Sequence, residues 1–97
     1  MAKLIWTDKA TVSLEKIAEF IAKDSVFYAK KTVLEINKLT KVLKTYPNSG
    51  RIVPECNEIF IRELIYKSYR IIYKIDNDSI YILTVISGYK ELKNGEL

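Results

Sequence analysis

The first half of the chain shows a helical repeat of hydrophobic positions. Between Thr7 and about Ala22, apolar residues recur at intervals of three and four, and the set is Leu14, Ile17, Ala18 and Ile21. This spacing places them on one face of an amphipathic helix. Thr7 or Asp8 can cap its first turn. The pattern therefore predicts a first helix over residues 7–22.

A second helix is predicted from near Ser25 to about Tyr46. The Ser25 hydroxyl can accept a hydrogen bond from an early backbone N–H, and Pro47 with the polar residues 48–50 ends the helical pattern. Its apolar stripe consists of Ala29, Val33, Ile36, Leu39, Leu43 and Tyr46. Because the join at residues 23–24 is short, we expect the two helices to pack as an antiparallel hairpin.

The second half has the composition of β-strands. Residues 58–66, 69–75 and 79–86 are rich in Ile, Tyr, Val and Phe, which suit a pleated, half-buried surface. A short strand at residues 2–6 is expected to join them. The predicted fold class is α+β, with an N-terminal antiparallel two-helix hairpin packed on a small twisted antiparallel sheet. We expect residues 1–97 to form a single domain.

The turn between the last two predicted strands determines which residues face one another. A two-residue loop of Asn77 and Asp78 predicts the pairs Ile75–Ile80, Tyr73–Ile82, Ile71–Thr84 and Tyr69–Ile86. The opposite face then carries the pairs Arg70–Val85, Ile72–Leu83 and Lys74–Tyr81. We expect this second face to point away from the helices, so that Arg70 reaches solvent or a partner.

Composition excludes several classes of protein. A hydrophobic fraction of 48% argues against disorder, and no apolar run reaches the roughly 18 residues that cross a bilayer. The first ten residues lack the apolar core of a signal peptide, so we expect a cytoplasmic protein without membrane association. The single cysteine, Cys56, has no second thiol or histidine with which to bind zinc, and it is predicted to pack as a half-buried apolar residue. No metal or cofactor is expected.

The positive charge lies in the first half of the chain. Residues 1–50 hold nine lysines and five acidic residues, whereas residues 51–97 hold seven of each sign, and the net charge is +4. Such a surface attracts nucleic acid or an acidic protein. Lys38, Lys41 and Lys44 recur at helical spacing, which is typical either of a solvated helix face, the interpretation we favour, or of a binding stripe.

Several segments together resemble one family of proteins. They are Trp6 before a helix, GRIVPE at 50–55, IREL at 61–64, YRIIY at 69–73 and VISGYKEL at 85–92. In this order and spacing, the chain resembles the RelE/ParE superfamily of toxins from type II toxin–antitoxin systems. The resemblance implies a compact α+β toxin that forms a hetero-oligomer with a small antitoxin. Antitoxins of this kind are typically acidic, which suits the net charge of +4.

The superfamily divides into two activities. RelE-like members resemble ribosome-dependent endoribonucleases that cut mRNA, whereas ParE-like members poison DNA gyrase and carry no catalytic set. The nuclease branch has basic residues in the strand before the shared arginine, where this chain has Ile61 and Glu63. It also tends to end with an arginine and a tyrosine or histidine–tyrosine, where this chain offers Lys90 and Tyr89 and has no histidine. We therefore favour a ParE-like gyrase poison; the alternatives are a RelE-like nuclease and a degenerate member that only binds its antitoxin.

If the protein is a nuclease, three residues are candidates for its chemistry. Glu55 resembles the general base of some mRNA-cleaving toxins, Arg70 can hold the scissile phosphate and Lys90 can act as a second cation. The simpler interpretations are that Glu55 is a solvated loop acid and that Lys90 is an exposed charge near the terminus. Under the gyrase hypothesis no catalytic residue is assigned.

Arg70 has two interpretations of equal weight. If Lys67 and Ser68 form a two-residue turn, Glu63 is the diagonal neighbour of Arg70 and can pair with it; otherwise Arg70 contacts the target. A turn of three or five residues would instead bring Arg62 to the face of Arg70. The expected contacts with target or antitoxin are Arg62, Arg70, Ile72, Leu83, Val85, Tyr89 and Lys90. Three of these, Ile72, Leu83 and Val85, form an apolar patch that an antitoxin should cover.

Overall fold

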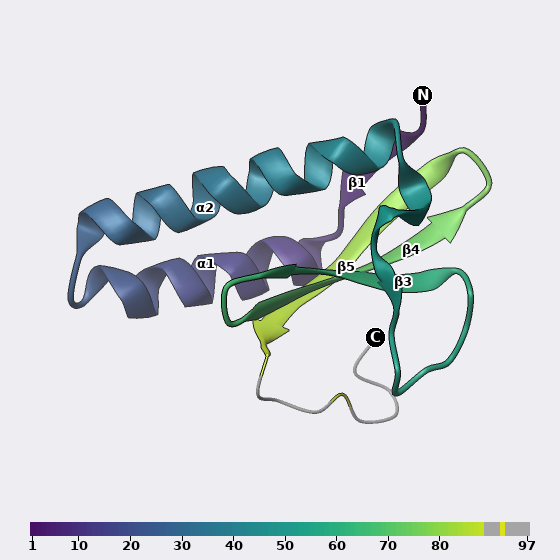
Figure 1. Ribbon diagram of the computed structural model, residues 1–97. Coiled ribbons are helices and arrows are strands. Elements are labelled where there is room, and N and C mark those ends of the chain that lie inside the picture. The colour runs from purple at the N-terminus through teal and green to yellow at the C-terminus, as the bar shows by residue number, and fades with distance from the viewer. Residues whose placement is uncertain (89–91, 93–97) are drawn as a thin grey trace.

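A two-helix hairpin lies against one face of a five-stranded sheet in the computed structural model, which describes residues 1–88 and 92 (Figure 1). The elements are β1 (Lys3–Trp6), α1 (Asp8–Ala22), α2 (Val26–Lys41), two short 3₁₀ turns (Val42–Lys44 and Pro47–Ser49), β2 (Arg51–Ile52), β3 (Ile61–Tyr66), β4 (Tyr69–Asp76) and β5 (Ser79–Ser87). The predicted α+β class and the predicted helix hairpin are therefore confirmed.

The sheet is mixed rather than purely antiparallel. Its strand order is β1-β5-β4-β3-β2, and β1 runs parallel to β5 with Lys3 opposite Ser79 and Trp6 opposite Ile82. The other neighbouring strands are antiparallel. The expectation of a fully antiparallel sheet is wrong at the β1 edge. Parallel neighbours require a long connection, and the helix hairpin with the strands after it provides one.

Both helices begin where their capping residues predict. The Thr7 hydroxyl accepts a hydrogen bond from the Ala10 N–H at 3.1 Å, and the Ser25 hydroxyl accepts one from Tyr28 at 3.1 Å. These bonds satisfy backbone donors that the first turn of a helix leaves unpaired.

The second helix ends earlier than predicted. Regular α-helix stops at Lys41, and a 3₁₀ turn continues to Lys44. Pro47 disfavours helical geometry in the residue before it, and Tyr46 has φ −125° and ψ 75°. The Tyr46 side chain is consequently 65% exposed instead of closing the apolar stripe.

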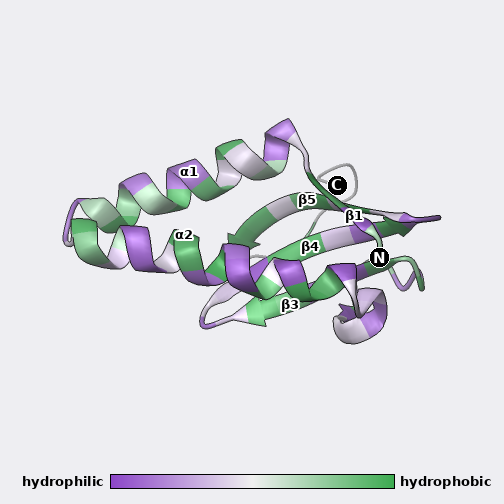
Figure 2. Cartoon of the chain, turned by 90° about the horizontal axis from the view of Figure 1, so that it is seen from above, coloured by the Kyte–Doolittle hydropathy of each residue, from purple (hydrophilic) through white to green (hydrophobic). Residues whose placement is uncertain are grey.

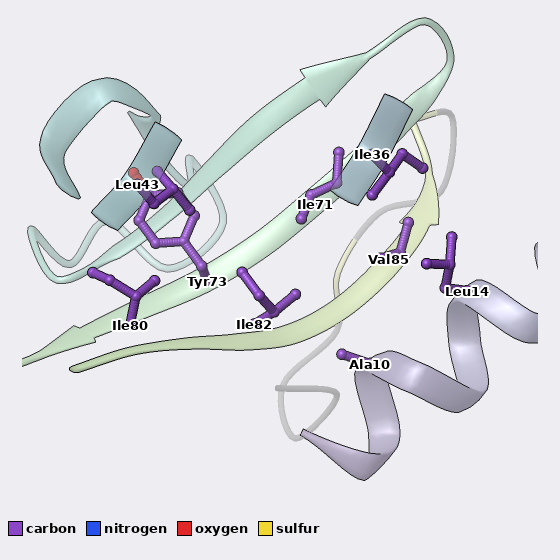
Figure 3. Packing of buried hydrophobic residues seen from close by; sticks show 9 residues of the cluster. All are labelled: Ala10, Leu14, Ile36, Leu43, Ile71, Tyr73, Ile80, Ile82 and Val85. Carbon is purple, nitrogen blue, oxygen red and sulfur yellow. The ribbon is translucent and has the colours of Figure 1, made fainter. Parts of the chain in front are cut away.

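The main core lies between the helices and the sheet. Hydrophobic and hydrophilic positions alternate along both helices (Figure 2), and the hydrophobic ones that belong to the core cluster pack against the strands. The buried cluster comprises Ala10, Leu14, Ile36, Leu43, Ile71, Tyr73, Ile80, Ile82 and Val85 (Figure 3). Tyr73 is fully buried, yet its hydroxyl donates to the Pro47 carbonyl at 2.7 Å and accepts from the Gly50 N–H at 3.0 Å. These bonds attach the chain before β2 to the core.

The hairpin of β4 and β5 follows the predicted register only near its turn. The pairs Ile75–Ile80, Tyr73–Ile82 and Lys74–Tyr81 form as predicted, and Asn77 has the positive φ of 53° that such a turn requires. The register then shifts between Ile72 and Tyr73, and the pairs beyond it are Ile72–Thr84, Ile71–Val85, Arg70–Ile86 and Tyr69–Ser87. The predicted pairs Ile71–Thr84, Tyr69–Ile86, Arg70–Val85 and Ile72–Leu83 are therefore wrong.

A β-bulge at Leu83 causes the shift. Leu83 has no partner on β4, and one extra residue reverses the face to which every later side chain points. Val85 consequently joins the core beneath the helices, whereas Ile86 packs on the opposite face.

Side chains of the first helix bind the backbone next to the bulge. The Thr7 hydroxyl donates to the Ile82 carbonyl at 2.7 Å, and the Val85 N–H donates to the Ser13 hydroxyl at 2.9 Å. A bulge disrupts the regular ladder, so these backbone groups need partners from outside the strand pair.

We expect Ser13→Ala to destabilise the protein by about 1–3 kcal/mol, because it leaves the buried Val85 N–H without its acceptor. Urea denaturation would measure the loss, and amide exchange at Val85 should accelerate. The matched control is Thr11→Ala at an exposed position of the same helix, for which a change within about 0.5 kcal/mol is expected. Equal stability of the two variants would contradict the proposed support of the bulge.

Candidate functional site

The turn between β3 and β4 determines the surroundings of Arg70. Tyr66 lies opposite Tyr69, so Lys67 and Ser68 form the two-residue turn, and Lys67 has φ 51°. Ile65 therefore faces Arg70. The alternative register, with a longer turn, is not the one that forms.

Arg62 accordingly lies on the face opposite to that of Arg70. It is paired with Tyr73, whose side chain belongs to the core beneath the helices. The Arg62 guanidinium donates to the carbonyls of Ile59 at 2.9 Å and Gly50 at 3.0 Å. Its described contacts therefore hold the loops on either side of β2 rather than a partner.

Arg70 binds two carboxylates among the described residues. Its Nε donates to Glu63 Oε1 at 2.5 Å, and its Nη1 and Nη2 donate to the two oxygens of Glu55 at 2.8 Å each. Glu63 also accepts from Arg51 Nε at 2.5 Å. The pairing of Arg70 with Glu63, one of the two interpretations left open by the sequence, is present in the structure, and Glu55 is a second partner that the sequence did not indicate.

The ion cluster is buried on the sheet face that points away from the helices. Arg70 is 6% exposed and Glu63 is 1% exposed. The expectation that Arg70 reaches solvent is therefore wrong. The reason is that the loop between β2 and β3, which carries Glu55, folds over this face and brings its own carboxylate to the guanidinium.

The apolar patch predicted beside Arg70 is also covered by the chain itself. Ile72 is fully buried against Val53 and Leu92, and Leu83 packs against this cluster half-buried. Val85 faces the helices instead, as the bulge requires. The three residues therefore do not form the exposed patch that the sequence predicted.

Cys56 lies at the margin of this second cluster and is half-buried, as predicted. Burial raises the pKa of its thiol, which favours the unreactive protonated form. Tyr89 and Lys90, the other expected contacts, lie outside the described residues.

The electrostatics of Glu55 do not suit a general base. Hydrogen bonds from the Arg70 guanidinium lower the pKa of the Glu55 carboxyl from 4.5 to about 2, although partial burial opposes the shift. Proton abstraction near neutral pH works best when the base has a pKa close to the pH at which it operates. The pKa of Arg70 is raised, chiefly by hydrogen bonding to Glu55. The cluster therefore consists of charges that neutralise one another.

A second feature, which the sequence analysis did not identify, is an apolar groove between the two helices. It has a volume of about 460 Å³ and lies where the small side chains of Ala18, Ala22 and Ala29 leave space. Val33 and Leu34 contribute its apolar wall, and Glu19 and Lys30 also line it. The signal in the sequence was the set of alanines on facing sides of the predicted hairpin.

Large apolar side chains are exposed near this groove, both at the end of the hairpin where α1 joins α2 and further along α2. Phe20, Phe27 and Leu34 are 69%, 68% and 55% exposed. In Figure 1 this end of the hairpin extends beyond the edge of the sheet. Exposed apolar surface next to an apolar groove is typical of a site for a protein partner.

Within residues 1–88 and 92, no cluster of three or more His, Cys, Asp or Glu side chains is arranged to hold a metal ion. Neither helix of this part of the chain combines the length and apolar character needed to cross a membrane.

We expect Glu63→Ala to destabilise the protein by about 3–5 kcal/mol, because it removes a buried carboxylate that neutralises the buried Arg70. Equilibrium unfolding in urea would measure the change. Glu58→Ala removes an exposed acid from the preceding loop and should change stability by less than about 0.5 kcal/mol. If Glu63→Ala lowers the free energy of unfolding by less than about 1 kcal/mol, the buried pair of Arg70 and Glu63 is not needed for stability.

Glu55 should make stability depend on pH in a defined range. Between about pH 4.5 and about pH 2 the unfolded chain binds a proton at this carboxyl that the folded chain does not, so stability falls as the pH falls. Thermal unfolding measured across this pH range should show that the melting temperature depends less steeply on pH for Glu55→Gln than for the wild type. The control Glu58→Gln should keep the slope of the wild type. Identical slopes for wild type and Glu55→Gln would refute the lowered pKa.

Comparison with known proteins identifies the family. Residues 4–91 match the family model described as the ParE toxin of the type II toxin–antitoxin system, parDE. No curated protein matches the chain in sequence. A solved structure, the chromosomal ParDE TA system from P. aeruginosa, is similar with a TM-score of 0.74 and 24% identity over 90% of this chain and 96% of that one. That likeness concerns the fold, whereas the family model spans nearly the whole sequence. The chain therefore belongs to the ParE toxin family of type II toxin–antitoxin systems.

Proposed function

We propose that the protein is the toxin of a type II toxin–antitoxin module and that it arrests growth by poisoning DNA gyrase. The choice of gyrase rather than mRNA as the target rests on the ion pairs that Arg70 forms with Glu55 and Glu63. A nuclease of the RelE type needs a cation for the phosphate and groups that transfer protons near neutral pH. Arg70 is engaged by Glu55 and Glu63 instead, and the pKa of Glu55 is held at about 2.

The strand before Arg70 supports the same choice. The two positions at which the nuclease branch carries basic residues are Ile61, which packs in the apolar cluster with Val53 and Ile72, and Glu63, which binds Arg70. Neither side chain can neutralise a phosphate. A gyrase poison needs no catalytic group on the sheet face that carries Arg70.

We also propose that a cognate antitoxin neutralises the toxin by docking into the groove between α1 and α2. The similar solved structure is a ParDE system. The groove is lined almost entirely by apolar atoms. Lys30 at the groove and the exposed Lys31 and Lys38 on the same helix would favour an acidic partner that inserts an apolar side chain.

The choice of target is tested by adding the purified protein to DNA gyrase and plasmid DNA and measuring cleavage complexes. We expect linear DNA to accumulate with protein concentration and to decrease when the antitoxin is added. Primer extension on mRNA from cells that express the toxin should show no breaks in the ribosomal A site. Breaks at that position without gyrase cleavage would favour the nuclease alternative, and harmless expression would favour the degenerate one.

Ala22→Phe tests the docking site. A bulky side chain that fills the groove should weaken antitoxin binding by about 10- to 100-fold, the equivalent of roughly 1–3 kcal/mol of steric misfit. Titration calorimetry with the antitoxin encoded beside the toxin would measure it. Val26→Phe, at a 58% exposed position that does not line the groove, is the matched control. Equal affinities for the two variants would place the antitoxin elsewhere.

A further inference from the structure

One face of α1 carries a row of three lysines. Lys9, Lys16 and Lys23 recur at every seventh residue, and all three are exposed. Seven residues make almost two turns of a helix, so these side chains project from one face at intervals of about 10 Å. Lys23 follows the last residue of α1 and keeps helical dihedral angles, with φ −57° and ψ −35°. The row, which we call the lysine face, therefore follows the length of α1.

The acidic residues of α1 point in other directions. Asp8 and Glu15 each stand directly before a lysine of the row, and consecutive residues of a helix point about 100° apart. Glu19 lines the groove between the two helices. The carboxylates of α1 therefore project away from the face that carries the lysines.

A pocket of about 320 Å³ lies beside the middle of the lysine face. It lies between α1, the turn from β3 to β4 and the end of β5, and it is lined by Lys16, Ile17, Phe20, Ser68, Tyr69 and Ser87. The described residues that line it include one cation and no acid. The pocket is therefore partly apolar and positively charged.

Phe20 gives this pocket an exposed aromatic ring. Its side chain is 69% exposed, and the Lys23 ammonium lies 5.8 Å from the centre of the ring. Aromatic rings that alternate with cations bind single-stranded nucleic acid, because bases stack on the rings while the cations neutralise the phosphates. An acidic protein segment would also attract the lysines, but a nucleotide brings a flat base and a phosphate together. The combination therefore favours a nucleic acid.

We propose that the lysine face of α1 binds a single strand of DNA. The phosphates contact Lys9, Lys16 and Lys23, and one unstacked base enters the pocket against Phe20. The excess of lysines in the first half of the chain supports an anionic ligand on this side of the molecule. The identification of this strand as the DNA that gyrase holds rests on the proposed function, whereas the binding of DNA by α1 does not.

This surface is separate from the two sites described above. Arg70 lies on the sheet face that points away from the helices, where Glu55 and Glu63 neutralise it. The groove meets α1 at Ala18 and Ala22, which are not residues of the lysine face. A DNA strand and an antitoxin would therefore contact different sides of α1.

The first test replaces Lys9, Lys16 and Lys23 together by glutamine. Fluorescence anisotropy would measure binding of a labelled oligo(dT) of about 12 nucleotides, a length within the usual range for such sites. We expect the affinity to fall by at least about tenfold. The slope of the logarithm of affinity against the logarithm of salt concentration should become shallower by about 2, because three phosphate contacts to a single strand are lost.

The control variant makes the same change of charge elsewhere. Lys3, Lys41 and Lys74 are exposed on three other elements, and their joint replacement by glutamine should leave the salt slope unchanged and lower the affinity less than threefold. Both triple variants should stay folded, with melting temperatures within a few degrees of the wild type. Equal losses of affinity in the two variants, or no binding by the wild type, would overturn the proposal.

Phe20→Ala tests the contact with a base. The affinity for oligo(dT) should fall by at least about fivefold with an unchanged salt slope, since stacking does not release counterions. A duplex of the same length should bind the wild type more weakly than the single strand. An unchanged affinity of Phe20→Ala would overturn the proposal. Displacement of oligo(dT) by poly-glutamate as readily as by unlabelled oligo(dT) would also overturn it and favour an acidic protein as the ligand.

A gyrase assay separates this inference from the proposed function. If the bound strand is the DNA that gyrase holds, the variant lacking Lys9, Lys16 and Lys23 should form at least about tenfold fewer cleavage complexes than the control variant. Full cleavage by a variant that has lost oligo(dT) binding would overturn the role of this strand. If the wild type forms no cleavage complexes, the proposed function fails, and the anisotropy measurements still decide whether α1 binds DNA.

Discussion

The buried guanidinium of Arg70 organises the sheet face that the helices leave uncovered. A cation in a site that is 6% exposed is tolerated only when carboxylates neutralise it and accept its hydrogen bonds. Glu63 meets this requirement from the neighbouring strand and Glu55 from the loop between β2 and β3. That loop is consequently drawn over the sheet, where Val53 and Leu92 bury Ile72.

The two faces of the sheet are thus stabilised in different ways. On one face the helices supply apolar side chains. The hydroxyls of Thr7 and Ser13 also form hydrogen bonds with the backbone on either side of the bulge at Leu83. The other face is stabilised without a helix, by the small apolar cluster of Val53, Ile72 and Leu92 and by the ion pairs of Arg70. The groove that we propose for the antitoxin lies between the two helices of the hairpin.

Much of the fold was predictable from the sequence because its signals are local. The helix starts at Thr7 and Ser25 follow from capping chemistry, and the two-residue turn at 77–78 follows from the strands beside it. The length of the turn at 67–68 stayed open in the sequence, and the structure shows the two-residue form. The bulge was not predictable, since Leu83 and its neighbours suit either face of a strand. The backbone beside it is hydrogen-bonded to Ser13, which lies 72 positions away from Val85 in the chain.

The candidate site was predictable only in part for the same reason. Glu63 was a diagonal neighbour of Arg70 once the turn was known, whereas Glu55 lies in a loop without hydrophobic periodicity and its position depends on the guanidinium itself. The groove arises from space left by Ala18, Ala22 and Ala29 at facing positions, which the periodicity of each helix alone does not reveal.

The central claim is that Arg70 is neutralised within the chain and is not a binding group for phosphate. It is tested most directly by following the NMR signal of the Arg70 Nε–H while a short RNA oligonucleotide is titrated into the folded protein. We expect a slowly exchanging signal that does not move, because this N–H donates to Glu63. A saturable shift of that signal would contradict it.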